Sequence, residues 1–245
     1  MRTVIFHYHL FKNAGTSLDA AFKENFSEEK GEWVTKEFPA NRRQNQEQVK
    51  QWIIDNPQAK CFSSHTAQLP PPQIDGVRVL PVLFIRHPID RIASAYSFET
   101  KQPGNSVGAV IARNTDLKGY VEIRIAIPND GQCQNFHTSR LSQYRQDPNK
   151  TALDNAKFAL ENLYFVGVVE HFNDSIAKLE QQLRNDGFNN IALKPKAHNT
   201  SRSYKSSLEE KLEEIRAKVG DETYEKLNEE NLSDLTLHQE LVSRF

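Results

Sequence analysis

The sequence has few of the features that mark exported, membrane-spanning or nucleic-acid-binding proteins. Only two of its 245 residues are cysteines, Cys61 and Cys133, so we expect free thiols and no disulfide framework. No apolar run approaches the roughly 18 residues that are needed to cross a bilayer. The 31 basic and 32 acidic residues leave a net charge of −1, which excludes a bulk electrostatic attraction to nucleic acid or to an anionic membrane.

The start of the chain and its length bound the location and the number of domains. An apolar stretch begins at Thr3 and leaves no room for a signal peptide, so we expect a cytoplasmic protein that binds no membrane. A chain of 245 residues suits one α/β domain over 1–245. Within it, residues from about 206 to 245 are charged and predict a helical extension packed on the rest.

Short apolar runs alternate with amphipathic stretches along the chain. Runs rich in β-branched and aromatic residues predict strands at 3–11, 33–35, 60–64, 77–85 and 163–169. Apolar residues three and four positions apart predict helices at 18–22, 45–55, 90–98, 117–127, 135–144, 152–162, 172–183, 208–219 and 235–245, with a strand as the alternative for 117–127. This alternation predicts a doubly wound α/β fold with a central parallel sheet, in which ligands bind at the carboxyl ends of the strands.

Proline and glycine affect the prediction in two stretches. Residues 101–114 contain Pro103, Gly104 and Gly108, and for them we expect a mobile connection. Pro81 interrupts the most apolar run of the chain. Because proline has no N–H to donate, we expect the first half of 77–85 at a sheet edge or outside the ladder.

The loop Lys12-Asn13-Ala14-Gly15-Thr16-Ser17 joins the first predicted strand to the first predicted helix. A loop that enters a helix N-terminus directs backbone N–H groups and the positive end of the helix dipole at one spot. Gly15 allows a ligand to approach closely, Lys12 adds a positive charge, and the two hydroxyls can donate hydrogen bonds. The loop therefore predicts a phosphate site, with an ordinary strand–turn–helix connection as the alternative. It is not the P-loop of nucleoside triphosphatases, in which the lysine follows the second glycine.

Polar residues follow three of the predicted strands: Lys12, His65 and Arg86. Arg86 and Ser94 are eight residues apart, at the end of a strand and about two turns into the next helix. An arginine fork and a serine hydroxyl in such positions can hold a second phosphate. In the alternative, Arg86 pairs with Asp90 and Ser94 faces solvent.

Two segments resemble the sulfotransferases that use 3′-phosphoadenosine-5′-phosphosulfate (PAPS). The loop 12–17 resembles their 5′-phosphosulfate loop, and 84–98 (Phe-Ile-Arg-His-Pro-Ile-Asp-Arg-Ile-Ala-Ser-Ala-Tyr-Ser-Phe) resembles their 3′-phosphate motif. Weaker matches at 134–141 and 165–172 continue the pattern in the expected order. Within this family, the two phosphate motifs are most similar to the carbohydrate sulfotransferases related to heparan sulfate 2-O-sulfotransferase.

The resemblance implies a P-loop-kinase-like three-layer α/β fold, PAPS as the donor substrate and no required metal. By position, the 5′-phosphosulfate would be held by Lys12, Asn13, Ala14, Gly15, Thr16 and Ser17. Arg86 and Ser94 would hold the 3′-phosphate, and Ser201 and Arg202 lie where the family closes over the donor. The chain departs from the family at His87, where an aspartate is usual, and at Asn13, where a threonine or serine is frequent.

A hydroxyl acceptor needs a general base, and histidine titrates close to neutral pH. The predicted base is His65, since Ser63-Ser64-His65-Thr66 resembles the segment with the catalytic histidine in the 2-O-sulfotransferase relatives. A structural histidine at the strand end is the alternative reading of His65. Lys12 would stabilise the charge on the leaving phosphate. The other histidines considered are the reserve candidates His137 and His198 and, with core or edge roles expected, His7 and His9.

Two other functions fit parts of the sequence. A magnesium-dependent kinase would need a carboxylate at a strand end, and a non-catalytic nucleotide-binding protein would need only the fold. The expected acceptor is a carbohydrate or a glycosylated metabolite. A cationic groove for an anionic polysaccharide would draw on residues that can equally be ordinary surface charges: Arg42, Arg43, Arg113, Arg140 and Arg145.

Overall fold

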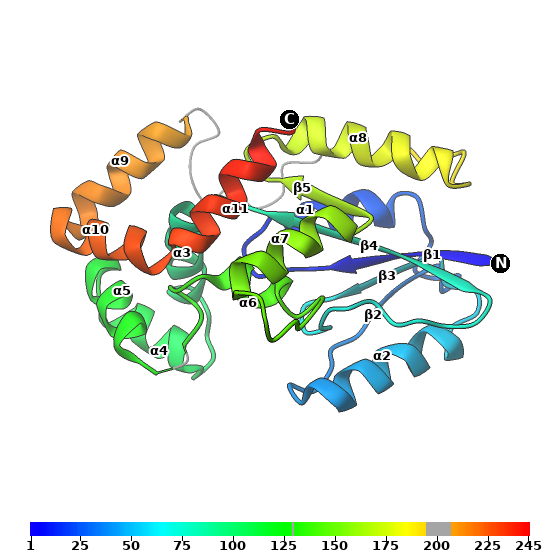
Figure 1. Ribbon diagram of the computed structural model, residues 1–245, viewed down its shortest axis with the longest axis horizontal. Helices are drawn as coiled ribbons and strands as arrows, with labels where there is room; N and C mark the ends of the chain where they lie inside the picture. The colour runs from blue at the N-terminus through cyan, green and yellow to red at the C-terminus, as the bar shows by residue number, and fades with distance from the viewer. Residues whose placement is uncertain (129, 195–206) are drawn as a thin grey trace.

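The structure is a computed structural model and describes residues 1–128, 130–194 and 207–245. Five parallel strands form a sheet in the order β2-β3-β1-β4-β5. The strands are β1 Arg2–Tyr8, β2 Trp33–Thr35, β3 Cys61–Ser64, β4 Val77–Ile85 and β5 Phe165–Val168. The central strand β1 lies between β3 and β4 (Figure 1).

The connection from β3 to β4 is a loop, whereas the other connections between strands contain helices and β5 is followed by further helices. The helices are α1 Gly15–Lys23, α2 Arg42–Asp55, α3 Pro88–Glu99, α4 Val107–Asn114, α5 Leu117–Ala126, α6 Phe136–Leu141, α7 Ala152–Asn162, α8 Phe172–Asn185, α9 Leu208–Val219, α10 Asp221–Glu230 and α11 Leu232–Val242. With this sheet, the arrangement confirms the predicted α/β fold and agrees with a P-loop-like three-layer architecture.

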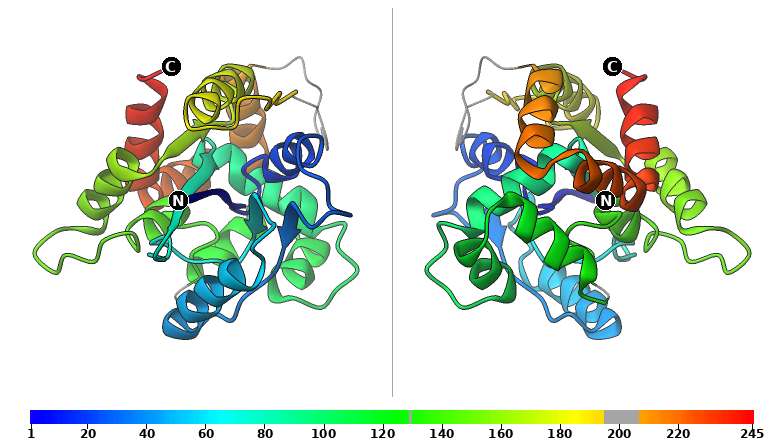
Figure 2. Two further views of the ribbon diagram at one scale, coloured as in Figure 1. Left: turned by 90° about the vertical axis from the view of Figure 1, so that its right-hand side faces the viewer. Right: turned by 90° about the vertical axis from the view of Figure 1, so that its left-hand side faces the viewer.

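Both faces of the sheet are covered (Figure 2). On one face α1 and α8 pack over Ile5 and Phe84. On the other face α2, α7 and α11 pack over Phe6 and Leu83. Successive residues of a strand point to opposite faces, so a strand that is buried on both sides reads as an unbroken apolar run.

A third apolar cluster lies at the carboxyl ends of the strands. Helices α3, α4, α5, α9 and α10 build it around Ile92, Tyr120, Ile215 and Leu227. In Figure 1 the strand arrows point towards this group of helices. The sheet edge that carries the predicted site is therefore next to a packed helical wall.

The structure corrects the expected mobile connection over 101–114. Residues 107–114 form α4, whose N-cap Ser106 accepts a hydrogen bond from the N–H of Ala109. Gly108 does not break this helix but lets it approach a neighbour, because a Cβ atom there would lie 2.3 Å from Oε1 of Glu99. Close packing, rather than flexibility, explains this glycine.

The expectation that the first half of 77–85 lies at a sheet edge is confirmed, because the strand pairs with β5 only after Pro81. Pro81 stands opposite Phe6 of β1, while β5 pairs with β4 only from Val82 onward. Pro81, which has no N–H to donate, therefore comes just before the part of β4 that also pairs with β5. Other predicted elements differ mainly at their ends: β1 stops at Tyr8 instead of residue 11, and α6 stops at Leu141 instead of residue 144.

Two features of the composition reappear in the structure. Cys61 and Cys133 are free and buried, as expected. Across 1–128, 130–194 and 207–245, none of the helices combines the length and the apolar character that a membrane crossing requires.

Gly167 of β5 gives a direct test of the packing between β5 and β4. A Cβ atom at this position would lie 2.5 Å from the ring of Phe84, so Gly167→Ala should lower the free energy of unfolding by about 1–3 kcal/mol. The control Gly104→Ala places its methyl group in open space and should change stability by less than about 0.5 kcal/mol. Urea unfolding measures both, and equal stabilities of the two variants would contradict the packing.

Candidate functional site

The structure brings the three predicted strand-end residues to one edge of the sheet. Lys12 follows the central strand β1, His65 follows its neighbour β3, and Arg86 follows its other neighbour β4. Because all three strands are parallel, their carboxyl ends lie side by side. The loop of Lys12 is therefore placed between His65 and Arg86.

The loop between β1 and α1 has the backbone of an anion-binding turn. Lys12 and Ala14 both adopt the left-handed conformation, with φ of 63° and 59°. Ala14 is the N-cap of α1 and offers no side-chain oxygen, so the first N–H groups of this helix have no side-chain cap. Turns of this kind direct successive N–H groups towards an anion, as a phosphate site requires.

Gly15 is needed in this loop because His9 packs against it. A Cβ atom on Gly15 would lie 2.0 Å from Cδ2 and 2.3 Å from Nε2 of His9. Farther along the first turn of α1, Thr16 is exposed and Ser17 is buried. The absence of a side chain at Gly15 thus makes room for the ring of His9 on the protein side of the loop and also leaves the ligand side open.

The ammonium group of Lys12 lies 4.5 Å from the ring centroid of Phe98 on α3. Partial burial, together with the positive charges of Arg86 and Lys101, lowers the pKa of Lys12. The positive charge of Arg86 therefore acts on Lys12, the other residue predicted to hold a phosphate (the two are called the phosphate anchors below). A bound dianion would relieve the repulsion between them.

Arg86 makes the alternative contact considered for it. Its Nε donates a hydrogen bond of 2.8 Å to Oδ2 of Asp90, one turn into α3. Ser94 is only 8% exposed, so it does not face solvent as that alternative supposed. The contact with Asp90 holds the guanidinium at the end of β4 and occupies the N–H groups along one edge of that guanidinium.

His65 is oriented by a residue that the sequence interpretation missed. Its Nδ1–H donates to Oε1 of Glu37 at 2.7 Å, and Glu37 also accepts hydrogen bonds from the N–H of His65 and from Oγ1 of Thr66. The side chain of His65 is about half exposed, and the bond at Nδ1 leaves Nε2 free to accept a proton from a substrate. Glu37 follows β2 just as the other site residues follow their strands, and this position was the available signal.

A buried cluster around Asp19 of α1 lies behind His65. Asp19 accepts hydrogen bonds from Nδ1–H of His7, Nδ1–H of His9 and the hydroxyl of Ser63, at 2.6, 2.9 and 2.7 Å. Burial alone would raise the pKa of Asp19, but the two histidines outweigh it and hold that pKa well below its usual range. The ring of His9 stacks on His65 with centroids 3.9 Å apart.

The same cluster has the composition of a metal site. Ligand atoms of His7, His9 and Asp19 lie within 4.8 Å of one another. The short contacts between the histidine nitrogens and the carboxylate are hydrogen-bond distances, so direct hydrogen bonding accounts for the arrangement. His7 at the end of β1 and His9 directly after it are two residues apart, a spacing that puts both on one side of an extended chain and that the sequence could have shown.

His137, a reserve candidate for the base, supports the loop instead. It is completely buried, and its Nε2–H donates to Oδ1 of Asn13 at 2.9 Å. Its Nδ1 lies 3.0 Å from Oδ2 of Asp234 on α11. A side chain without solvent access is unsuited to deprotonate an acceptor, so His137 belongs to the scaffold of the site.

A second buried group lies beside Arg86. Glu170, just after β5, accepts a hydrogen bond from the N–H of His87 at 2.8 Å and one from Nε2–H of His238 at 2.9 Å. Burial would raise the pKa of Glu170, but the His238 contact overcomes it and lowers this pKa to about 2. Carboxylates thus follow two strands, with Glu37 after β2 and Glu170 after β5.

The remaining predicted site residues, Ser201 and Arg202, and the reserve histidine His198 lie outside the described residues.

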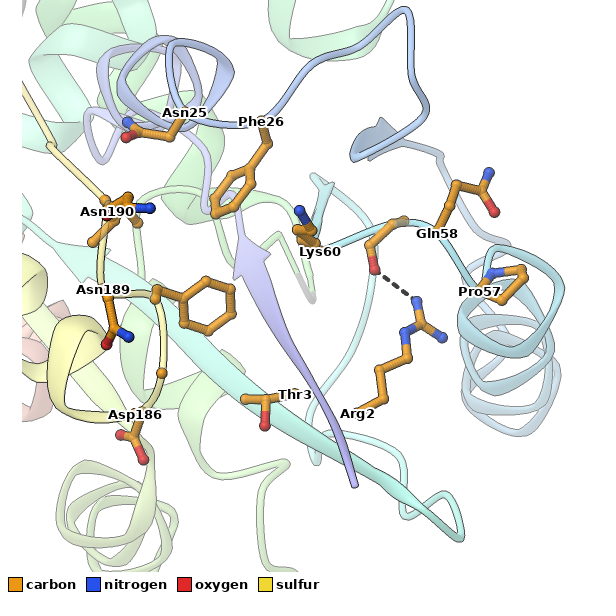
Figure 3. Close-up of a pocket in the computed structure, with 14 residues that line it drawn as sticks. Arg2, Thr3, Asn25, Phe26, Pro57, Gln58, Lys60, Asp186, Asn189 and Asn190 are labelled. Carbon is orange, nitrogen blue, oxygen red and sulfur yellow. Dashed lines mark hydrogen bonds between the residues drawn. The ribbon is translucent and has the colours of Figure 1, made fainter.

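The sheet also has a cavity at its opposite edge (Figure 3). Arg2 and Thr3 at the start of β1, Phe26 after α1 and Lys60 before β3 line it. The guanidinium of Arg2 donates to the backbone carbonyls of this region, including that of Ala59 at 2.7 Å. These bonds make Arg2 structural, and the cavity lies away from the strand ends where α/β folds bind ligands.

Comparison with known proteins identifies the family of this chain. A sequence model described as "Sulfotransferase family" matches residues 2–239. The chain belongs to the sulfotransferase family. An uncharacterised protein of Archaeoglobus fulgidus is 40% identical to it over 251 residues, covering the whole of this chain and 98% of that relative. Membership supports sulfuryl transfer as the general activity of this enzyme, and the α/β fold with its parallel sheet agrees with it.

The pH dependence of stability tests the environment of His87. Burial, reinforced by the charge of His238, lowers the pKa of His87 to about 4 from 6.5. Since the unfolded chain takes up this proton first, folding stability should be greatest above pH 6.5 and fall as the pH drops towards 4. The loss due to His87 should be up to about 3 kcal/mol.

Urea unfolding of the wild type and of His87→Gln between pH 4 and 7.5 measures this effect. The variant should show a shallower decline over the same window, with Glu170, His238, Asp90 and Arg86 unchanged around it. Parallel pH profiles of the two proteins would contradict the buried, neutral state of His87.

Proposed function

We propose that this enzyme transfers the sulfuryl group of PAPS to a hydroxyl of a carbohydrate or a glycosylated metabolite. The observation that carries the proposal is the position of Lys12 and Arg86 at the ends of adjacent parallel strands, each within a segment that matches a phosphate-binding motif. One nucleotide with phosphates at its 5′ and 3′ positions would engage both. Family membership supports the class of reaction, and the two anchors point to this donor.

The 5′ end of the donor would lie on the loop of residues 12–17. The uncapped N–H groups at the start of α1 and the hydroxyls of Thr16 and Ser17 would hold its oxygens. Lys12 supplies a full charge beside the bond that breaks. Charge grows on the leaving phosphate during transfer, and a cation fixed there before the reaction lowers the barrier.

The 3′-phosphate would lie against Arg86 and Ser94. Asp90 fixes the guanidinium from one side, which leaves its other N–H groups for the ligand. The fixed distance between the ends of β1 and β4 would then select a nucleotide with two separated phosphates. Ser201 and Arg202, which lie outside the described residues, are proposed to contribute to donor binding.

His65 is the proposed general base. Glu37 holds its Nδ1–H, so Nε2 is directed outward and can take the proton of the acceptor hydroxyl as that oxygen attacks sulfur. The ring of His9, fixed by Asp19, supports the other face of His65. This arrangement resembles the carboxylate–histidine pairs that set the tautomer of a base in other enzymes.

The acceptor side is proposed to lie near α2 and α6. Arg42 donates to the backbone carbonyl of Gln143, which places it beside the segment of Arg140 and Arg145. Arg113 instead donates to backbone carbonyls within its own connection and is not part of this group. Three guanidinium groups on one side would favour an acidic sugar, in line with the resemblance to the heparan sulfate 2-O-type enzymes.

A magnesium-dependent phosphoryl transfer is less well supported. It would need a carboxylate at a strand end that is available to a metal. In the described part of the chain, Glu37 is engaged by His65 and Thr66, and Glu170 by His87 and His238.

Substitution of either anchor should weaken binding of the desulfated nucleotide, adenosine 3′,5′-bisphosphate. We expect Lys12→Ala and Arg86→Ala each to raise Kd by about 10- to 100-fold, because a hydrogen bond to a charged group contributes about 1.5–3 kcal/mol. The control Lys50→Ala removes an exposed charge of α2 and should leave Kd unchanged. Titration calorimetry measures all four proteins, and unaltered affinity in both anchor variants would refute the donor site.

Substitution of the proposed base should separate turnover from donor binding. With PAPS and a panel of sugar acceptors read by mass shift, His65→Ala should lower kcat by about 10²- to 10⁴-fold and leave donor affinity intact. Glu37→Gln keeps the ring but loses the charged hydrogen-bond partner, so a smaller drop of about tenfold is expected. Near-normal turnover of His65→Ala would show that another group is the base.

A further inference from the structure

Two buried residues of α11 reach towards the two phosphate anchors from behind. Asp234 and His238 are four residues apart and therefore lie on the same face of the helix. Both are buried, with 0% and 6% of their surface exposed. Neither belongs to the motifs at 12–17 and 84–98 that identify the donor site, and both lie far beyond these segments in the sequence.

Asp234 is connected to the 5′ loop through α6. Its carboxylate accepts hydrogen bonds from the backbone N–H groups of His137 and Thr138, at 2.8 and 2.7 Å, and from the hydroxyl of Thr138 at 2.7 Å. It thereby caps the N-terminus of α6 and fixes His137. The ring of His137 then donates to Asn13, inside the loop between Lys12 and Ala14.

The connection between α11 and α6 is made in both directions. The side chain of Asn135, the N-cap of α6, accepts a hydrogen bond from the N–H of Asp234 at 3.1 Å. Asn231, directly before α11, accepts one from the N–H of Asn135 at 3.0 Å. Each helix caps the other, so a shift of α11 displaces the ring that holds Asn13.

His238 is connected to the other anchor through Glu170. Its Nε2–H donates to Glu170, whose second oxygen accepts the N–H of His87 at the turn between β4 and α3. His87 is directly after Arg86. This chain of two hydrogen bonds therefore fixes the backbone from which the guanidinium of the 3′ anchor extends.

We propose that Asp234 and His238 are positioning residues, and that α11 acts as one support which sets the 5′ and 3′ phosphate anchors relative to each other. The proposal rests on the donor site described above and adds the element that holds it. A single face of one helix carries both hydrogen-bond chains, and its Leu237 and Leu241 are buried in the core under the sheet. Each chain serves one anchor, so loss of one should affect one phosphate of the nucleotide more than the other.

Nucleotides with a single phosphate test this division. We expect Asp234→Asn to weaken binding of adenosine 5′-monophosphate by about tenfold and of adenosine 3′-monophosphate by less than about threefold. His238→Gln should show the opposite preference. The control Gln239→Ala, exposed on the same helix, should leave both affinities within about twofold. Equal losses for both nucleotides in both variants, or no loss, would overturn the proposal.

Hydrogen exchange of the free protein separates this proposal from the assignment of the donor. Without any nucleotide, Asp234→Asn should speed exchange in residues 9–17 and leave 84–91 unchanged, and His238→Gln should do the reverse. If the wild type binds none of the nucleotides but the two variants show this exchange pattern, the donor assignment fails and the support by α11 stands. Identical exchange patterns in the two variants would refute the support whatever the ligand.

Because Asp234 is buried and caps α6, its substitution could prevent folding. Asn13→Ala breaks the same chain at its far end and leaves both helix caps in place. It should weaken adenosine 5′-monophosphate selectively, as Asp234→Asn does. A loss by Asn13→Ala that is equal for the 5′ and the 3′ monophosphate would contradict the division between the two chains.

Discussion

The parallel pairing of β1 with β3 and β4 is the constraint on which the rest of the site depends. Three strands that run in the same direction end at the same edge, so the residues after them converge without any long-range signal in the sequence. The apolar residues of β1 bury both faces of the strand and hold this register. The proximity of Lys12, His65 and Arg86 is a consequence of that pairing, since each of them lies in the segment after one of these buried strands.

Carboxylates that would otherwise be costly to bury hold the histidines of the site. Asp19, Asp234 and Glu170 lie in or beside the core, and each accepts at least two hydrogen bonds from N–H or O–H groups. Those bonds offset the desolvation of the charge, which keeps the pKa of each group low. Glu37 holds His65 by a hydrogen bond of the same kind, but at the surface. In the proposed mechanism the chemistry therefore depends on a few outward-facing groups, and acid–histidine contacts lie behind them.

Most of the fold and the first layer of the site could be predicted from the sequence, because both depend on local patterns. Strand and helix periodicity predicted the alternation, and the rule on strand ends selected Lys12 and Arg86 as candidate site residues. Local reasoning failed where a contact joins distant segments: Asp234 meets His137 across 97 residues, and Glu37 meets His65 across 28. Gly108 was misjudged for a related reason, since its close approach to the side chain of Glu99 cannot be read from the local sequence.

The central claim is that the separation between Lys12 and Arg86 matches the separation between the 5′ and 3′ phosphates of one nucleotide. Titration calorimetry of the wild type with adenosine 3′,5′-bisphosphate and with adenosine 5′-diphosphate, in buffer with and without magnesium, tests it most directly. Both ligands carry two phosphates, but only the first has them on opposite sides of the ribose. The account predicts at least about tenfold tighter binding of the 3′,5′-bisphosphate with no effect of magnesium. Equal affinities, or magnesium-dependent preference for the 5′-diphosphate, would contradict it.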